Sequence, residues 1–218
     1  MKILAIDTCT EVASVTLYSS NVKTTRVLTD IAKSSGYILK LCDEVFKEAG
    51  NNLQEVDFIS YTKGPGAFTG VRMCVGVVQG LSFSCGIPTL GFSTLELLAF
   101  RASKILKKDK IATAIDARMG EVYWAVYDNG SISNMRICKP ENVDNLGASF
   151  VGVGSGWKVH NDELIKASQI NHTDSNIYPE STDLIDLSLL AIELGQKATF
   201  DLPQPIYLRN NVAQKSLK

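Results

Sequence analysis

The chain has 218 residues, of which 45% are hydrophobic and 21% are charged, and its formal net charge is −1 at pH 7. This composition is that of an ordinary globular protein and excludes intrinsic disorder. Since a domain typically has about 150 residues, the length allows one large or two small domains whose cores need no disulfide or metal. A charge so close to zero also argues against a protein that grips a nucleic-acid backbone by itself.

The cysteines and the N-terminus exclude several classes of protein. The five cysteines are odd in number and include no C-x-x-C pair, which argues against a disulfide framework or a zinc ribbon and favours a reducing compartment. The chain reaches Asp7 before a signal-peptide core could form. Its most apolar stretch, residues 71–87, is too short to cross a bilayer and contains Arg72 and Gln79. We therefore expect a cytoplasmic protein with no membrane partner.

The first elements of the chain recur half a chain length later. A strand that ends at Ile6-Asp7 is followed by a tight turn and a second strand that ends at Tyr18. The same order returns with Ile115-Asp116 and a second strand that ends at Tyr127. A third strand follows in each half, at about 24–29 and 131–138. A repeat of this length predicts two similar lobes; the alternative is a chance resemblance between the halves.

This repeat predicts an α/β fold of two duplicated lobes, each in the order β-β-β-α-β-α, with mixed sheets flanked by helices. We place the first lobe at residues 1–105 and the second, smaller lobe at residues 106–218. A helical pattern at about 183–200 could cross back to the first lobe, so the boundary is approximate. In such a fold we expect Asp7 and Asp116 to face each other across a cleft between the lobes.

Residues 35–49 predict a helix with an unusually wide apolar face. Its apolar residues cover about 200° of the helix, whereas a helix that faces one core needs a stripe of only about 100°. We therefore expect part of this face to contact another protein, and we expect Leu39, at its edge, to be exposed in an isolated monomer. The residues expected at this interface are Tyr37, Ile38, Leu39, Leu41, Cys42, Val45 and Phe46.

A second helix is predicted over residues 70–85, with Thr69 as its N-cap. It is apolar on nearly all sides, and a helix of this kind in a globular protein is covered on more than one side. Its own sheet can cover one side, and the other side then needs a third layer or a partner. The residues expected at this part of the interface are Met73, Val77, Gly80 and Leu81.

Two glycine-rich segments are candidate phosphate-binding loops, although neither fits an established template. Residues 64–72 lack the Lys and Ser/Thr of a P-loop, and their third glycine comes one residue too late for a dinucleotide motif. Residues 151–157 could bring Gly154 and Gly156 close to a nucleotide or could simply turn the chain. They do not fit the G-x-S-x-G motif of serine hydrolases.

The turns after the two repeated strands could contribute to a weak nucleotide site. Their Asp and Thr side chains would lie where phosphate or Mg²⁺ could bind, and the alternative is that these residues only form the turns. The nucleotide-binding candidates are Asp7, Thr8, Thr10, Asp116, Arg118, Gly154 and Gly156.

No catalytic or metal-binding residue is predicted. His160 and His172 lie in polar, loop-like surroundings and have no His, Cys or carboxylate at ligand spacing. No Ser/His/Asp or Cys/His arrangement typical of nucleophilic catalysis is recognisable either.

Five segments spread over the chain carry a resemblance to a known family. They are ILAIDT (3–8), GPGAFTGVR (64–72), GFSTL (91–95), IDARMGEVYW (115–124) and PIYLRNN (205–211). On these segments the chain resembles the TsaB (YeaZ) family, a subunit of the bacterial tRNA threonylcarbamoyladenosine synthase. The second and fourth segments are the most specific.

The resemblance implies two actin-like, ribonuclease-H-type lobes and a non-catalytic role. The chain would bind the catalytic actin-like subunit, in a complex that also contains a small ATPase subunit. It would thereby support threonylcarbamoyl transfer to an adenosine of tRNAs that read ANN codons. It would form a homodimer when alone and contact tRNA at most indirectly. It would have no cofactor of its own, and ATP or ADP would bind only at a site shared with the partner.

Two departures separate the chain from catalytic relatives. The catalytic subunit holds its metal through two histidines on its first helix, whereas residues 34–39 contain none. Actin-like kinases have the motif Asp-x-Gly-Thr, and here Cys9 takes the place of the glycine that lets a phosphate approach. Two other hypotheses stay open. One is a stand-alone actin-like kinase or ATPase, favoured by Asp7 and Asp116, and the other is a peptidase that acts on its relative.

Overall fold

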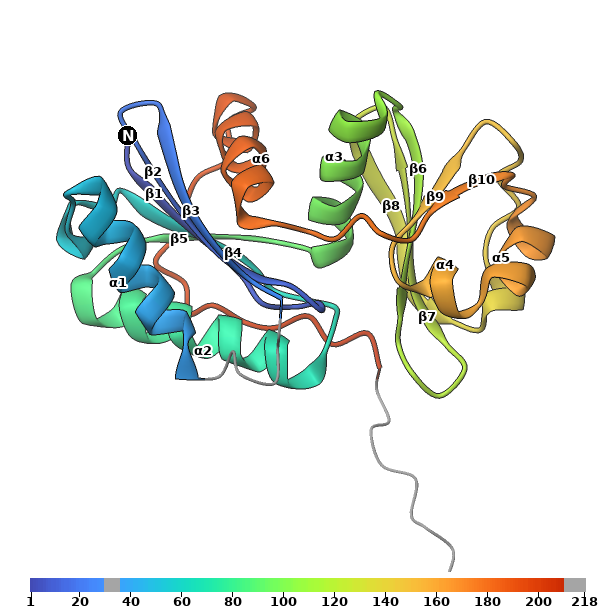
Figure 1. Ribbon diagram of the computed structural model, residues 1–218, viewed down its shortest axis with the longest axis horizontal. Coiled ribbons are helices and arrows are strands. Elements are labelled where there is room, and N and C mark those ends of the chain that lie inside the picture. The colour runs from blue at the N-terminus through green and yellow to red at the C-terminus, as the bar shows by residue number, and fades with distance from the viewer. Residues whose placement is uncertain (30–35, 210–218) are drawn as a thin grey trace, which may run out of the picture.

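The computed structural model describes residues 1–29 and 36–209, which form two lobes that lie side by side (Figure 1). Each lobe is built on a mixed sheet of five strands. The strands of the first sheet are β1 (Ile3–Asp7), β2 (Ala13–Ser19), β3 (Val22–Leu28), β4 (Phe58–Thr62) and β5 (Thr89–Phe92). Those of the second are β6 (Lys110–Asp116), β7 (Val122–Asp128), β8 (Ser131–Cys138), β9 (Val151–Val153) and β10 (His172–Asp174).

The two sheets repeat one topology. The strand orders are β3-β2-β1-β4-β5 and β8-β7-β6-β9-β10. The central strand β1 pairs antiparallel with β2 and parallel with β4, and β6 pairs in the same way with β7 and β9. Asp7 and Asp116 are the last residues of these central strands. The predicted duplicated, actin-like α/β fold is therefore confirmed.

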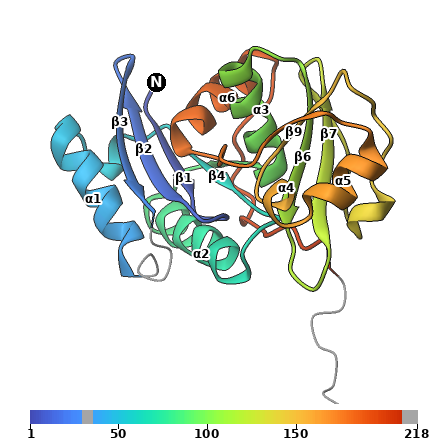
Figure 2. The same ribbon diagram turned by 45° about the vertical axis from the view of Figure 1, so that its right-hand side comes forward.

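The helices divide the molecule into layers. They are α1 (Ile38–Ala49), α2 (Phe68–Cys85), α3 (Thr94–Leu106), α4 (Gly156–Val159), α5 (Asn161–Ser168) and α6 (Ser181–Glu193), with 3₁₀ turns η2 (Leu53–Glu55) and η3 (Pro140–Asn142). Helices α1 and α2 cover one face of the first sheet, and α6 covers the other (Figures 1 and 2). Helices α3 and α6 lie between the sheets, and α4 and α5 cover the outer face of the second sheet.

Helix α3 joins the two lobes because it buries apolar side chains on two sides. Leu97 packs with α6 and the first sheet, whereas Leu95 and Leu98 pack on the second sheet. The expected boundary at residues 105 and 106 therefore separates the sheets, while α3 and α6 each pack beyond it. The outer core of the second lobe is built around Trp124 and Trp157, whose ring centroids are 6.1 Å apart.

The second lobe departs from the predicted order of elements. The short turn η3 stands where the first lobe has the long helix α1, and the short helices α4 and α5 follow β9. The C-terminal helix spans Ser181–Glu193 rather than about 183–200, and it packs on the first sheet. The chain then continues along the first lobe, where Thr199 forms an antiparallel bridge with Thr89.

The starts of the two long helices also differ from the prediction. Helix α1 begins after Tyr37, and the predicted start at residue 35 lies outside the described residues. Helix α2 begins two residues earlier than predicted, because the carbonyl of Ala67 already accepts a hydrogen bond from Val71 N at 2.9 Å. Ala67, rather than Thr69, is therefore the N-cap.

Helix α2 is, within residues 1–29 and 36–209, the single helix whose length and apolar composition would suit a membrane span. This is weak evidence, because a helix packed on a sheet has the same composition. Val71, Cys74 and Val78 of α2 are buried against the first sheet.

Candidate functional site

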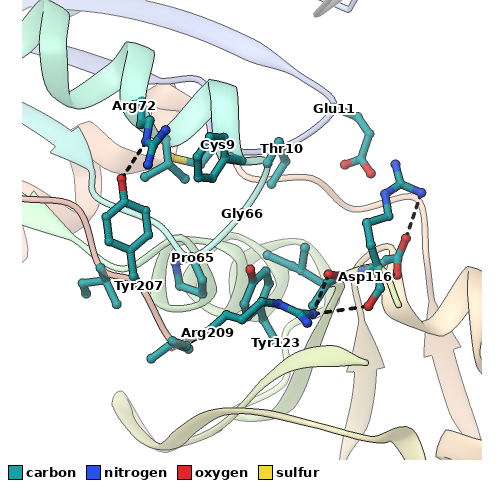
Figure 3. A pocket seen from close by; sticks show the side chains of 18 of the residues that line it. Cys9, Thr10, Glu11, Pro65, Gly66, Arg72, Asp116, Tyr123, Tyr207 and Arg209 are labelled. Carbon is teal, nitrogen blue, oxygen red and sulfur yellow. Dashed lines mark hydrogen bonds and ion pairs between the residues drawn. The ribbon is translucent and has the colours of Figure 1, made fainter. Parts of the chain in front are cut away.

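A cleft of about 800 Å³ opens between the lobes (Figure 3). Its walls come from four segments that are far apart in the sequence. They are the turn after β1 (9–11), the start of α2 with its preceding loop (65–72), the turn after β6 (115–119) and the C-terminal segment (206–209). The ends of both central strands thus open onto one cavity.

The Asp7 carboxylate, however, is sealed away from this cleft. Its Oδ1 accepts hydrogen bonds from Thr62 Oγ1 at 2.5 Å and from Cys9 N at 3.2 Å. Its Oδ2 has no hydrogen-bond partner within the described part of the chain. Burial raises the pKa of Asp7 to about 6, against the opposing effect of the two hydrogen bonds. The prediction that Asp7 faces Asp116 across the cleft is therefore wrong.

Asp7 is buried because the start of α2 packs directly on the turn after β1. A Cβ atom on Gly66 would lie 2.0 Å from the Cys9 carbonyl oxygen, and one on Gly70 would lie 2.1 Å from that of Thr8. Thr8 Oγ1 donates a hydrogen bond to the Gly70 carbonyl at 2.6 Å. These glycines are thus required for close backbone packing, and Thr8 is buried beneath the helix instead of lining the cleft.

The glycines of the second lobe have a similar role. A Cβ atom on Gly154 would lie 2.6 Å from the Ala114 carbonyl oxygen, and one on Gly156 would lie 2.9 Å from the Ala114 side chain. Neither glycine lines the cleft. Their small size lets the chain after β9 pack on β6, so their placement at a nucleotide site is corrected.

The predicted residues that do line the cleft are Thr10, Asp116 and Arg118. Asp116 forms an ion pair with Arg118 at 3.0 Å, and its Oδ1 accepts a hydrogen bond from the Arg118 backbone at 2.9 Å. His160 Nε2 lies 3.8 Å from Asp116 Oδ1, and its side chain is 15% exposed, so this histidine lies half-buried beside the cleft turn.

The C-terminal segment is the part of the site that the sequence patterns missed. Arg209 reaches the second lobe, where its Nη2 lies 2.7 Å from Glu121 Oε2 and donates to the Ala117 carbonyl at 3.0 Å. On the first lobe, Ile206 N donates to the Lys63 carbonyl at 2.7 Å. The segment therefore ties the lobes together across one wall of the cleft (Figure 3). The one available signal was that residues 205–211 carry part of the family resemblance.

An arginine and two aromatic side chains form a cluster on the same wall. The Arg72 guanidinium lies 3.5 Å from the centroid of the Phe68 ring, and its Nε donates to Tyr207 Oη at 3.0 Å. All three side chains are exposed and line the cleft. Arg72 could have been singled out, because it is the single charged residue within α2.

The predicted interface residues of α1 separate into two groups. Ile38, Leu41, Cys42 and Val45 are buried in the core of the first lobe, so their assignment to an interface is corrected. The first sheet, which α1 contacts through β2 and β3, covers these four side chains of the wide apolar arc. Tyr37 and Leu39 remain exposed, Leu39 at 58%, as expected for an isolated monomer.

Helix α2 keeps an open apolar face. Phe46 of α1 and Met73, Val77 and Leu81 of α2 are partly buried against the core, whereas Gly80 is exposed. Phe83 is 91% exposed. The interface prediction for the outer faces of the two helices stays a prediction, now limited to these exposed and half-buried side chains.

The geometry can be compared with known proteins. The family described as TsaD, tRNA N6-adenosine threonylcarbamoyltransferase, matches residues 31–195. The tRNA threonylcarbamoyladenosine biosynthesis proteins TsaB of Escherichia coli and Haemophilus influenzae are each 33% identical to the chain. The alignments cover all of it and 98% and 97% of those proteins. The chain belongs to the TsaB family. YeaZ from Pseudomonas aeruginosa, a solved structure, matches with a TM-score of 0.84 at 33% identity over 95% of this chain and 99% of that chain.

The matched residues, 31–195, include β4 and β5 of the first sheet and all five strands of the second, and leave out β1, β2 and β3. Within the described residues, no three His, Cys, Asp or Glu side chains gather as a metal site would require. The expectation that the chain holds no metal remains a prediction.

Proposed function

We propose that this TsaB-family chain is a non-catalytic subunit in the biosynthesis of tRNA threonylcarbamoyladenosine. It binds the catalytic actin-like threonylcarbamoyltransferase, in a complex that also contains a small ATPase subunit, and acts in the cytoplasm. The 33% identity with TsaB proteins over the whole chain supports the pathway. The open apolar face of α2 is the single observation that carries the docking role.

The character of this face favours a protein partner. Phe83 is 91% exposed on the same helix as the half-buried Met73, Val77 and Leu81, and exposed apolar patches mark interaction sites. Gly76 and Gly80 lie on the exposed side of α2, and a Cβ atom on either would meet nothing within 4 Å. Their small size leaves room for the backbone of a partner helix to approach closely. Leu39 and Tyr37 are further exposed apolar side chains at the start of α1.

A homodimer through the same surface is part of this proposal. Two copies of an apolar face can cover each other when no other partner is present, so homodimer and complex would compete for it. The docking surface includes one wall of the cleft, because Arg72 lies on both. We expect tRNA to contact this chain at most indirectly.

Reconstitution tests the proposal. The catalytic subunit, the small ATPase subunit, tRNA and the threonylcarbamoyl adenylate are mixed with and without this chain, and modified adenosine is measured. We expect modification in the complete mixture and none with this chain alone. Modification by this chain alone, or an equal rate in its absence, would contradict a non-catalytic but necessary role.

A nucleotide at a site shared with the partner is a second proposal, supported by the cleft. Thr10, Asp116 and Arg118 line it, and the buried Thr10 hydroxyl has no hydrogen-bond partner among the described residues. Because Asp7 is sealed and Arg118 is paired with Asp116, these residues form an incomplete site for a polyphosphate. We expect ATP binding by calorimetry in the mixture with the catalytic subunit and none to this chain alone.

A further inference from the structure

Arg72 is a charged residue in a helix that is otherwise uncharged, and its side chain is held by two aromatic neighbours. The 18 residues of α2 include one charged side chain, Arg72, and no carboxylate. Arg72 is exposed, on the same side of the helix as Gly76, Gly80 and Phe83. Within α2, Arg72 therefore supplies the one positive charge of the docking surface.

The guanidinium is held in place from two sides. It stacks over the Phe68 ring at 3.5 Å, and its Nε donates to Tyr207 Oη at 3.0 Å. The Tyr207 ring also lies 5.7 Å from the guanidinium carbon. These contacts use the flat face and the Nε edge of the group, and leave the two terminal nitrogens as a planar pair of donors. Figure 3 shows Arg72 and Tyr207 together on one wall of the cleft.

Arg72 differs from the other two cleft arginines in its pairing. Arg118 is paired with Asp116, and Arg209 is paired with Glu121. Across residues 1–29 and 36–209, no carboxylate lies within ion-pair distance of Arg72. A guanidinium with this geometry matches a carboxylate, which can accept two parallel hydrogen bonds from the terminal nitrogens.

We propose that Arg72 receives a carboxylate side chain of the catalytic actin-like subunit when α2 docks, an inference that rests on the proposed function. Docking of the apolar face removes water from Arg72. A desolvated cation with no counter-ion opposes binding, whereas a cation paired with a fully hydrogen-bonded carboxylate fixes the register of the two surfaces. Because no carboxylate of the described residues pairs with Arg72, we assign this acid to the partner.

Tyr207 acts as a positioning residue in this arrangement. It belongs to the C-terminal segment, which is bound to the first lobe through Ile206 and to the second lobe through Arg209. The orientation of Arg72 on the docking helix therefore depends on a residue that lies 135 positions later in the sequence.

Calorimetric titration of the catalytic subunit into the full chain, at low and at high salt, tests this assignment. Arg72→Gln removes the charge, and Lys166→Gln removes the same charge from the exposed face of α5 in the second lobe as a matched control. We expect Arg72→Gln to weaken binding about 10- to 100-fold and to reduce its salt dependence. Arg72→Lys should recover part of the loss, because lysine keeps the charge without the planar pair of donors. Tyr207→Phe should weaken binding several-fold.

The outcomes separate this inference from the proposed function. If the wild-type chain does not bind the catalytic subunit, the docking role and the Arg72 assignment both fail. If the wild-type chain binds and Arg72→Gln binds equally well, the Arg72 assignment alone is wrong. A parallel titration of ATP into the mixture of this chain and the catalytic subunit distinguishes the two possible ligands of Arg72, a phosphate and a protein carboxylate. Loss of ATP binding in Arg72→Gln, with binding of the catalytic subunit unchanged, would identify Arg72 as a nucleotide contact and overturn the inference.

Discussion

The two lobes have the same strand order but use their outer faces differently. In the first lobe, α1 and α2 are long helices, and α2 leaves Phe83 and two glycines exposed. In the second lobe, short helices and the 3₁₀ turn η3 take their place, and the Trp124–Trp157 pair closes the core. The sheet is thus the repeated part of the molecule, and the helices are the part that differs between the lobes.

The two lobes also differ in what they contribute to the proposed function. The proposed docking surface lies on the first lobe, while the second lobe contributes the turn at Asp116 and Arg118 to the cleft. The C-terminal segment couples them, because it contacts α2 through Tyr207 and the second-lobe turn through Arg209.

The largest difference in stability is expected between substitutions at two glycines of α2, Gly70 on its buried side and Gly76 on its exposed side. Gly70→Ala would place a Cβ atom 2.1 Å from the Thr8 carbonyl oxygen, so the backbone must shift, at a cost of at least about 3 kcal/mol. Gly76→Ala meets nothing within 4 Å and should increase stability by about 0.5–1 kcal/mol, since alanine favours helix. Urea denaturation compares the two. Equal stabilities would show that α2 does not pack on the turn after β1.

The buried carboxylate of the first lobe should make stability depend on pH. The pKa of Asp7 is raised from 3.8 to about 6 in the folded chain, so between these values the folded state binds more protons than the unfolded state. The contribution of Asp7 to the free energy of unfolding is therefore full below about pH 4 and is lost as the pH rises through 6. The total loss is about 3 kcal/mol.

Asp7→Asn removes this titration. The difference in unfolding free energy between the wild type and the variant, measured in urea at pH 4, 6 and 8, should change by about 3 kcal/mol in favour of the variant as the pH rises. Parallel stability curves for the two proteins would mean that Asp7 is hydrated in solution.

A smaller loss of stability is expected when the two arginines at the turn after β6, Arg118 and Arg209, are replaced. Arg209→Ala removes a mostly buried ion pair with Glu121 and a hydrogen bond to the Ala117 carbonyl, and should cost about 1–2 kcal/mol. Arg118 is 85% exposed, so Arg118→Ala should change stability by less than about 0.5 kcal/mol despite its pair with Asp116. Thermal melts of both variants test the difference. A larger loss for Arg118→Ala would contradict the coupling role of the C-terminal segment.

The sheets could be predicted from the sequence, whereas the contacts between distant segments could not. The repeat of Asp7 and Asp116 at the ends of similar strands is a local pattern, and it placed both central strands. The C-terminal segment has no regular periodicity, so nothing in its sequence indicates that Tyr207 meets Arg72.

Helical periodicity and glycine motifs were informative only in part. The wide apolar arc of α1 could not reveal which part faces the sheet, and Ile38 and Leu41 proved to be core residues while Leu39 is exposed. Glycines that could admit a phosphate look the same in sequence as glycines that admit another backbone. At Gly66 and Gly154 the structure shows the second case.

The central claim, that the outer face of α1 and α2 docks the catalytic subunit, is tested most directly by Leu39→Asp. Leu39 is 58% exposed, so the variant should keep its thermal stability within about 0.5 kcal/mol. In the complex it would bury an unpaired carboxylate, at a cost of about 3–5 kcal/mol or a hundredfold or more in affinity. Size-exclusion chromatography with light scattering should show a complex for the wild type and separate proteins for the variant. A variant that still forms the complex at wild-type strength would contradict the claim.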